Sequence, residues 1–263
     1  MRISHEVPFC ILEQSIKFND IDFALVHLFE EYPEYYQFFV RSLRQGREVI
    51  LDNSVFELGY PFDEEIYKEW ILKLRPTYTI IPDKFENTKF TIESVLNWSM
   101  FLRANGLKSI GVIQGTSLNE FKECYKAISP FVDKVAISFA QPLFERLYPL
   151  ENKDFARMYG RLFLINYLYS EGALDTNKPH HLLGCSLPQE MKFYKNAGYS
   201  FIDSVDTSSP IVHGLKGIRY TKDGLKEKYP IKLVDLFDTS RDQVLSEDIS
   251  LQHNINMFKS FLS

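Results

Sequence analysis

The chain has 263 residues, of which 45% are hydrophobic, and a formal net charge of −5. This length fits one α/β-barrel domain, since such barrels run to roughly 250 residues. The negative charge excludes a global attraction to nucleic acid, so any polyanion would have to be bound by a local basic patch. We therefore expect a single domain over residues 1–263.

Apolar runs alternate with amphipathic segments along the chain, which predicts a parallel sheet covered by helices. Strands are expected at 22–29, 48–51, 78–81, 109–113, 134–138, 181–183 and 199–202. Helices are expected at 35–45, 63–74 (with Asp63 as N-cap), 91–104, 118–128, 154–169 and between Pro188 and Gly198. Residues 1–19 show no clear pattern, and an eighth strand is expected near 232–236. This many strands in one domain favour a closed (β/α)8 TIM barrel.

The three cysteines, Cys10, Cys124 and Cys185, are scattered and form no CxxC pair. This usage indicates a reducing compartment and argues against a disulfide framework or a structural zinc, so no metal is expected. The N-terminal MRISHEVPFC lacks the apolar run of a signal peptide. No segment approaches the roughly 20 apolar residues of a membrane span. The sequence thus predicts a soluble, cytoplasmic protein with no membrane partner.

The segment 181–210 is predicted to form a strand, a helix and a second strand. The first strand stops at Gly184, the helix closes at Gly198, and the second strand runs into Asp203, with Asp206 three residues later. Catalytic groups of a barrel lie at the C-terminal ends of its strands, so these carboxylates suggest a site. Asp residues at such positions also commonly cap the next helix, and the segment alone does not decide between the two.

Four predicted strands end in polar residues, namely Asp52, Asp83, Gln114 and Asp203. In a barrel these ends face one mouth, so three carboxylates and an amide would converge there. Two close carboxylates suit a double displacement at an anomeric carbon, in which one attacks and the other handles protons. A third carboxylate beside an amide suits the N1–H and N2–H edge of guanine. The spacing does not exclude other acid/base chemistry.

Four motifs follow one another on these strands. They are DNSVFE at 52–57, PDKFEN at 82–87, VIQG at 112–115, and the register of Gly184, Pro188, Gly198 and Asp203. In them the chain resembles the tRNA-guanine transglycosylases, and most closely the shorter phage DNA 7-deazaguanine transglycosylases, over residues 20–213. The corresponding motifs of that family are DSGGFQ, FDE, QQG or VQG, and a Gly-x-x-x-Pro segment followed by a Gly and the nucleophilic Asp.

The resemblance implies a role for each matching residue. Asp203 looks like the nucleophile and Asp52 like the general acid/base. Asp83 would accept the N1–H and N2–H of guanine. Gln114, followed by Gly115, would reach its O6.

The same resemblance places an aromatic ring and an apolar cover on the two faces of the base. Phe56 matches the stacking aromatic, although among 22 Phe it can also be a core residue. Leu183, followed by Gly184, lies where the other face is covered.

The chain also departs from the family. Ser54-Val55 replaces a glycine pair, so that loop is expected to take another shape. Ser138-Phe139-Ala140 replaces the Gly-Gly-Leu stretch that binds the base through its backbone, which makes Ser138 and Phe139 the candidates for that contact. The cysteine-rich zinc subdomain of the tRNA enzymes is absent, which favours a polynucleotide other than tRNA.

Asp206 is a second candidate for the catalytic carboxylate on the last strand. On an extended chain Asp203 and Asp206 point to opposite sides, so only one of them is expected to face the mouth. The register of the family motif favours Asp203.

The segment 213–232, HGLKGIRYTKDGLKEKYPIK, is expected to be a basic insertion near the barrel mouth. It holds six Lys/Arg against two acidic residues. Phosphates would be bound there, by Lys216, Arg219 and Lys222. A solvated loop and helix face is the ordinary alternative for such a run.

From the resemblance we expect an enzyme that exchanges guanine in DNA for a 7-deazaguanine base, 7-cyano-7-deazaguanine or a derivative. The reaction would pass through a covalent aspartyl-glycosyl intermediate, need no cofactor, and require a flipped or single-stranded nucleotide. A phage-encoded enzyme would act in the host cytoplasm. The alternatives are a tRNA-guanine transglycosylase of the queuosine or archaeosine type, a non-catalytic nucleic-acid-binding barrel, and an unrelated barrel hydrolase. The sequence does not fix the oligomeric state, and a homodimer is compatible with it.

Overall fold

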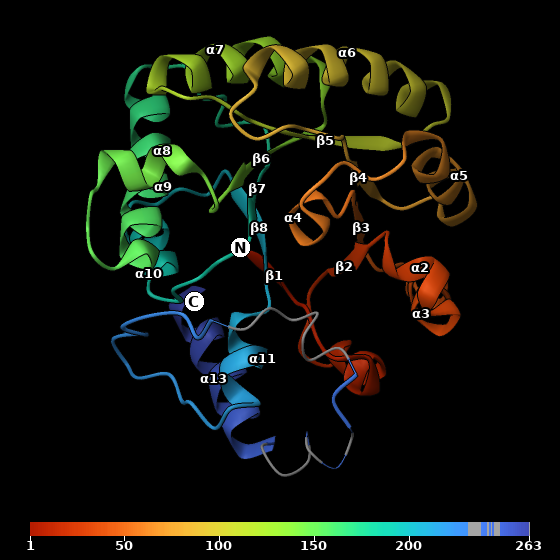
Figure 1. Cartoon of the computed structure of the whole chain (residues 1–263), viewed down its shortest axis with the longest axis vertical. Coiled ribbons are helices and arrows are strands. Elements are labelled where there is room, and N and C mark those ends of the chain that lie inside the picture. The colour runs from red at the N-terminus through yellow and green to blue at the C-terminus, as the bar shows by residue number, and fades with distance from the viewer. Residues whose placement is uncertain (231–237, 241, 243, 245–247, 263) are drawn as a thin grey trace.

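A computed structural model of the chain describes residues 1–230, 238–240, 242, 244 and 248–262. Eight parallel strands form one sheet that curls into a nearly closed barrel, with most of the helices outside it (Figure 1). The strands are β1 (Arg2–His5), β2 (Asp22–Leu25), β3 (Val49–Asp52), β4 (Tyr78–Ile80), β5 (Lys108–Val112), β6 (Lys134–Ser138), β7 (His180–Leu183) and β8 (Ile202–Thr207). The predicted (β/α)8 TIM barrel is confirmed.

The strands follow the order β1-β8-β7-β6-β5-β4-β3-β2 in the sheet. No ladder joins β1 to β2 among the described residues. There the N–H groups of Asp20 and Ile21 donate to the carbonyl of Ile3, just before β2 begins. All strand C-termini therefore lie at one end of the barrel, which fixes where a site can form.

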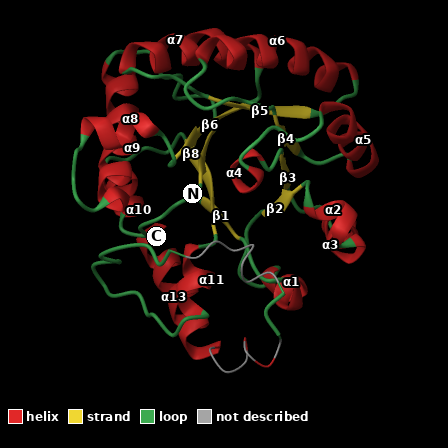
Figure 2. Ribbon diagram, in the orientation of Figure 1, coloured by secondary structure: helices red, strands yellow, loops and turns green. Residues whose placement is uncertain are grey.

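Helices of very different length surround the barrel (Figure 2). They are α1 (Leu12–Ser15), α2 (Leu28–Glu31), α3 (Pro33–Arg44), α4 (Val55–Leu58), α5 (Glu64–Leu74), α6 (Thr88–Ala104), α7 (Leu118–Ile128), α8 (Pro142–Leu147), α9 (Lys153–Ser170), α10 (Glu190–Asn196), α11 (Ser209–Gly214) and α13 (Asp248–Leu262), with 3-10 turns at Phe9–Ile11 and Ser129–Phe131. None of the described helices is long and apolar enough to cross a membrane.

Local capping chemistry sets where several of these helices begin. The Asp63 carboxylate accepts the N–H groups of Glu65 and Ile66, as the sequence predicts. Asn87 and Asn152 cap α6 and α9 in the same way. These caps fix the point at which each loop from the barrel mouth joins its helix.

The N-terminal residues form a strand that the sequence pattern did not reveal. Arg2–His5 pairs with β8 and supplies the eighth strand, whereas the expected strand near 232–236 lies outside the described residues. The segment RISH contains a single aliphatic residue, Ile3, which is fully buried. Periodicity cannot identify so short and polar a strand.

The last strand begins later than predicted. Tyr199 and Phe201 precede β8, and their rings contact that of Tyr169 of α9, so of the predicted run 199–202 only Ile202 belongs to the strand. The strand proper, IDSVDT, is mostly polar. Its pairing with β7 steps from His180↔Ile202 to His181↔Ser204, which leaves Asp203 as the extra residue of a β-bulge.

The predicted strand 22–29 is likewise too long. The strand ends at Leu25, and residues 28–31 turn into the short helix α2.

Candidate active site

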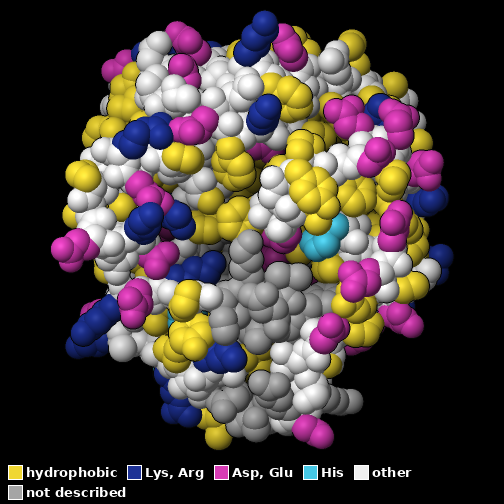
Figure 3. Space-filling model, viewed as in Figure 1, with side chains coloured by type: hydrophobic (Ala, Val, Ile, Leu, Met, Phe, Trp, Pro, Cys, Tyr) yellow, Lys and Arg dark blue, Asp and Glu magenta, His cyan; other side chains and the backbone are white. Residues whose placement is uncertain are grey.

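A pocket of about 1100 Å³, measured out to its open mouth, lies at the C-terminal ends of the strands. Nine residues singled out from the sequence line it: Asp52, Phe56, Asp83, Gln114, Ser138, Phe139, Leu183, Gly184 and Asp206. Figure 3 looks into this hollow, where acidic side chains lie deep and hydrophobic side chains gather around the rim. The pocket has the mixed apolar and polar lining of a small-molecule site.

Carboxylates dominate the charge of the pocket. Those of Glu6, Asp52, Glu57, Asp83 and Asp206 line it, and among the described lining residues Lys228 is the one lysine. Burial raises the pKa of Asp52 well above its ordinary value, and the neighbouring Glu57 adds to the shift. Burial, followed by repulsion from Asp206, likewise raises the pKa of Glu6. The shift of the Asp52 pKa favours the protonated carboxyl, the form that a general acid needs.

The turn after β3 holds the Asp52 carboxylate in place. Ser54 has a φ of +60°, in the left-handed region that costs a residue with a side chain about 1 kcal/mol. Its N–H donates to Asp52 Oδ2 at 2.7 Å. The glycine pair of the transglycosylase motif is replaced here by Ser54-Val55, and Ser54 still takes a backbone conformation that glycine favours.

The Asp206 side chain is 7% exposed and accepts two N–H groups. The backbone N–H of Gly184 lies 3.1 Å from its Oδ1 and 3.2 Å from its Oδ2. His181 Nε2 lies 2.9 Å from Oδ1. The carboxylate is thus oriented by His181 of β7 and by Gly184, which directly follows this strand, and Oδ2 is the less engaged oxygen.

Asp83 and Gln114 meet across the ends of β4 and β5. Gln114 Nε2 donates to Asp83 Oδ2 at 2.6 Å, which fixes the amide so that its oxygen points toward the N–H of Glu86. Burial raises the pKa of Asp83 to about 6, even though the hydrogen bond from Gln114 favours the charged form. A carboxylate beside an amide N–H presents one acceptor and one donor to the same ligand edge.

Aromatic rings form one wall of the pocket. Phe56 is 41% exposed, so it is not a core residue, and its ring lies 5.8 Å from that of Phe139. Phe139 packs directly on Gly184, where a Cβ would lie 2.4 Å from its Cδ1. Gly184 also has a φ of +70°. A side chain at Gly184 would therefore displace both Phe139 and the N–H that binds Asp206.

Gly115 lies behind the wall of the pocket rather than on it. A Cβ at this position would meet the backbone nitrogen of Phe121 at 2.8 Å, so the glycine allows close packing of the β5 end against α7.

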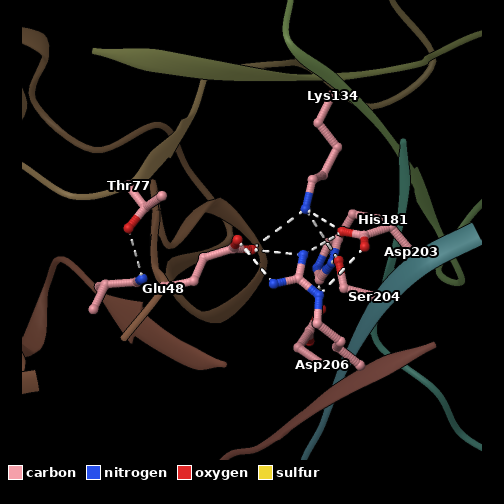
Figure 4. A network of polar contacts seen from close by, with 9 residues as sticks. Glu48, Thr77, Lys134, His181, Asp203, Ser204 and Asp206 are labelled. Carbon is pink, nitrogen blue, oxygen red and sulfur yellow. Dashed lines mark hydrogen bonds and ion pairs between the residues drawn. The ribbon is translucent and has the colours of Figure 1, made fainter. Parts of the chain in front are cut away.

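The structure places Asp203 away from the pocket, and the expectation that it faces the mouth is wrong. The residue lies at the start of β8, where its carboxylate binds Lys134 Nζ at 2.6 Å and Arg2 at 2.6 Å. Glu48 completes this ion-pair cluster at the N-terminal end of the barrel (Figure 4). The β-bulge described above moves Asp203 out of the register that the motif suggests, and Asp206 takes the place at the mouth.

Replacing Asp203 by Ala is expected to lower the free energy of unfolding by about 3 kcal/mol, because it removes the closest partner of a buried cation. Lys134 is 0% exposed and, among the described residues, would keep Glu48 at 3.5 Å as its one charged partner, beside the Ser204 hydroxyl at 3.3 Å. The double variant Lys134→Met/Asp203→Leu removes both charges and should recover most of the loss. Urea unfolding of the two variants checks this, and an Asp203→Ala protein as stable as the wild type would contradict it.

The basic segment 213–232 begins at the end of α11, and its later part returns to the pocket, which Lys228 lines. Lys216, Arg219 and Lys222 are exposed and lie outside the pocket, and residues 231 and 232 fall outside the described part of the chain. The return is fixed by buried His213, whose Nδ1 lies 2.7 Å from the Ser209 carbonyl and whose Nε2 accepts the Tyr229 N–H at 3.0 Å.

Sequence reasoning missed several residues of the pocket. Glu6 arrives from the unrecognised strand β1, and Lys228 arrives from the far end of the basic segment, with its Nζ 5.4 Å from the Phe139 ring. Burial lowers the pKa of Lys228. His27 and Phe85 also line the pocket. No local pattern marks these residues, although Glu57 and Asn53 lie inside the DNSVFE motif and could have been included.

No model of a known protein family and no curated protein matches this sequence. The geometry of the pocket therefore carries the functional argument.

Proposed function

We propose that the chain exchanges guanine in DNA for a 7-deazaguanine base, with Asp206 as the nucleophile and Asp52 as the general acid/base. The observation that carries the proposal is that the strand ends bring Asp206, Asp52 and the Asp83–Gln114 pair to one pocket. This set contains an attacking group, a proton carrier and a guanine-edge receptor. A double displacement at C1′ needs these three parts.

The proposed reaction has two steps. Asp206 forms a bond to C1′ of the target nucleotide as the C1′–N9 bond breaks, and Asp52 gives its proton to the departing guanine. The incoming 7-deazaguanine then loses its N9 proton to Asp52 and attacks C1′, which releases Asp206. Two inversions give net retention at C1′. The raised pKa of Asp52 supports its part, since the residue must hold a proton before the first step.

Asp83 and Gln114 would bind the base in both steps. An ionised Asp83 accepts the N1–H and N2–H, while the second N–H of the Gln114 amide is available to the O6. Phe56 and Leu183 line the same pocket and offer apolar contact to the faces of the base. The pocket lies inside the barrel mouth, so the target nucleotide must leave the base stack to reach it.

The function is tested by following labelled guanine out of duplex DNA and out of tRNA, side by side, with and without 7-cyano-7-deazaguanine. The proposal predicts release from DNA that depends on the incoming base. Release from tRNA alone would reassign the polymer and keep the chemistry. Release without the incoming base would indicate a hydrolase, and binding without any release would indicate a non-catalytic barrel.

The basic segment is expected to bind phosphates. If Lys216 and Arg219 each contact one, replacing both with Ala should weaken binding about equally for all DNA sequences. It should also make the salt dependence shallower by about one unit per lost contact. The matched control is Lys108→Ala/Lys126→Ala, which removes the same charge from exposed residues at the opposite end of the barrel. Equal salt slopes in the two double variants would show that the phosphates are bound elsewhere.

A further inference from the structure

A chain of buried polar groups runs along the barrel interior from the ion-pair cluster to Asp206 (Figure 4). Lys134 Nζ lies 3.3 Å from Ser204 Oγ, and Ser204 Oγ lies 2.9 Å from His181 Nδ1. His181 Nε2 then lies 2.9 Å from Asp206 Oδ1. Lys134, Ser204 and His181 are each 0% exposed, so water does not compete for these contacts.

The donors and acceptors in this series of hydrogen bonds fix the direction in which each group donates. A lysine ammonium only donates, so Ser204 Oγ accepts from Lys134 and its own hydrogen points to His181 Nδ1. A neutral imidazole that accepts at Nδ1 carries its hydrogen on Nε2. That hydrogen is aimed at Asp206 Oδ1. The ring of Phe23 stacks on the imidazole, with centroids 5.9 Å apart and 12° between the planes, and holds it in this orientation.

We infer that His181 is a positioning residue that holds Asp206 for attack on C1′, and that Lys134 sets the His181 tautomer through Ser204. The inference rests on the proposed function for the reaction that Asp206 performs. In the opposite tautomer the Nε2 lone pair would face the carboxylate and repel it. In the tautomer set by Lys134, Nε2–H donates to Oδ1 alone, whereas the Gly184 N–H is shared between Oδ1 and Oδ2, so Oδ2 is the less engaged oxygen and the one available for attack.

The neighbouring histidine is a matched control for this role. His180 is equally buried but faces the opposite side of β7, where its Nε2 lies 3.0 Å from the hydroxyl of Tyr125. Substituting either histidine removes a buried imidazole from the same strand. Only His181 touches Asp206.

The kinetic test compares His181→Phe, His181→Gln and His180→Phe in guanine exchange on DNA. His181→Phe should lower kcat by about 100-fold, the scale of a misplaced reacting group, with KM for DNA little changed. His181→Gln keeps an N–H donor and should recover part of the loss, and His180→Phe should exchange at nearly the wild-type rate. Circular dichroism checks that each variant is folded. Equal rates for the two Phe variants would overturn the inference.

The tautomer test does not depend on activity. In ¹⁵N-histidine-labelled wild-type protein, His181 should show the Nε2–H form, and Ser204→Ala should weaken that preference. His213, held as Nδ1–H by the Ser209 carbonyl, is an internal reference for the opposite form. A wild-type His181 protonated on Nδ1 would overturn the inference. An Nε2–H signal in a protein that exchanges no guanine would reject the proposed function and retain the orientation of Asp206.

Discussion

Replacing Asp206 by Asn is expected to abolish guanine exchange, with a loss in kcat of at least about 10⁴-fold, because the nucleophile of a covalent mechanism has no substitute. The carboxamide has nearly the same shape, so the pocket and nucleic-acid binding should persist. Initial rates of guanine release from DNA and a gel-shift measurement with the same DNA separate the two effects.

Asp203→Asn is the matched control for this substitution. The two residues lie three positions apart on β8, yet Asp203 binds Lys134 and Arg2 at the other end of the barrel. An Asn there keeps an oxygen acceptor and should leave a folded, less stable protein that still exchanges guanine. An inactive Asp203→Asn beside an active Asp206→Asn would reverse the assignment of the nucleophile.

Replacing Asp83 by Asn should weaken binding of the free 7-deazaguanine base by about 2–5 kcal/mol, because the guanine N1–H would face an amide that cannot accept both donors. Binding of DNA outside the pocket should change far less. Isothermal titration with 7-cyano-7-deazaguanine measures the first effect and a gel shift measures the second. An equal loss of both would point to a folding defect and contradict a role in base recognition.

The raised pKa of Asp83 predicts that the affinity for the base depends on pH. Burial raises the pKa of Asp83 to about 6, so in the free protein its carboxyl is protonated below that pH and ionised above it. Base binding needs the ionised form, and affinity should therefore rise as the pH increases through about 6. Asp83→Asn should lose this step. A wild-type affinity that falls over the same range would contradict the assignment.

The ion-pair cluster is also expected to make the stability of the folded protein depend on pH. Burial alone would raise the pKa of Asp203, but hydrogen bonds from Arg2 and Lys134 lower it to about 2. A depressed pKa in the folded state contributes stability above the ordinary Asp value of about 3.9, and this contribution is lost as the pH falls toward 2. The wild type should thus lose more stability between pH 4 and pH 2 than the Lys134→Met/Asp203→Leu variant does.

The parts of the barrel that the sequence predicted are those where an apolar strand ends in a polar residue. Val49–Leu51 before Asp52 and Tyr78–Ile81 before Asp83 are of this kind, and both carboxylates line the pocket. In such strands the hydrophobic run itself marks where the strand ends. The following polar residue is then placed at the mouth by the topology of the barrel.

Prediction from the sequence failed where the barrel interior is polar. In β8, Ser204 and Asp206 face inward and Asp203 forms a bulge, whereas the apolar residues before the strand pack outside with Tyr169. A hydrophobicity pattern read without the fold therefore shifts the strand toward Tyr199 and selects the wrong carboxylate. Glu6 and Lys228 were missed for another reason, since only tertiary structure brings them to the pocket.

The most direct test of the account is to trap the covalent intermediate and locate it. The protein is denatured during turnover with a guanine-containing DNA oligonucleotide, digested with nuclease and trypsin, and the peptide 196–216, which contains both Asp203 and Asp206, is fragmented in a mass spectrometer. The account predicts a nucleotide remnant on Asp206. A remnant on Asp203, or turnover that leaves no remnant on this peptide at any time point, would contradict it.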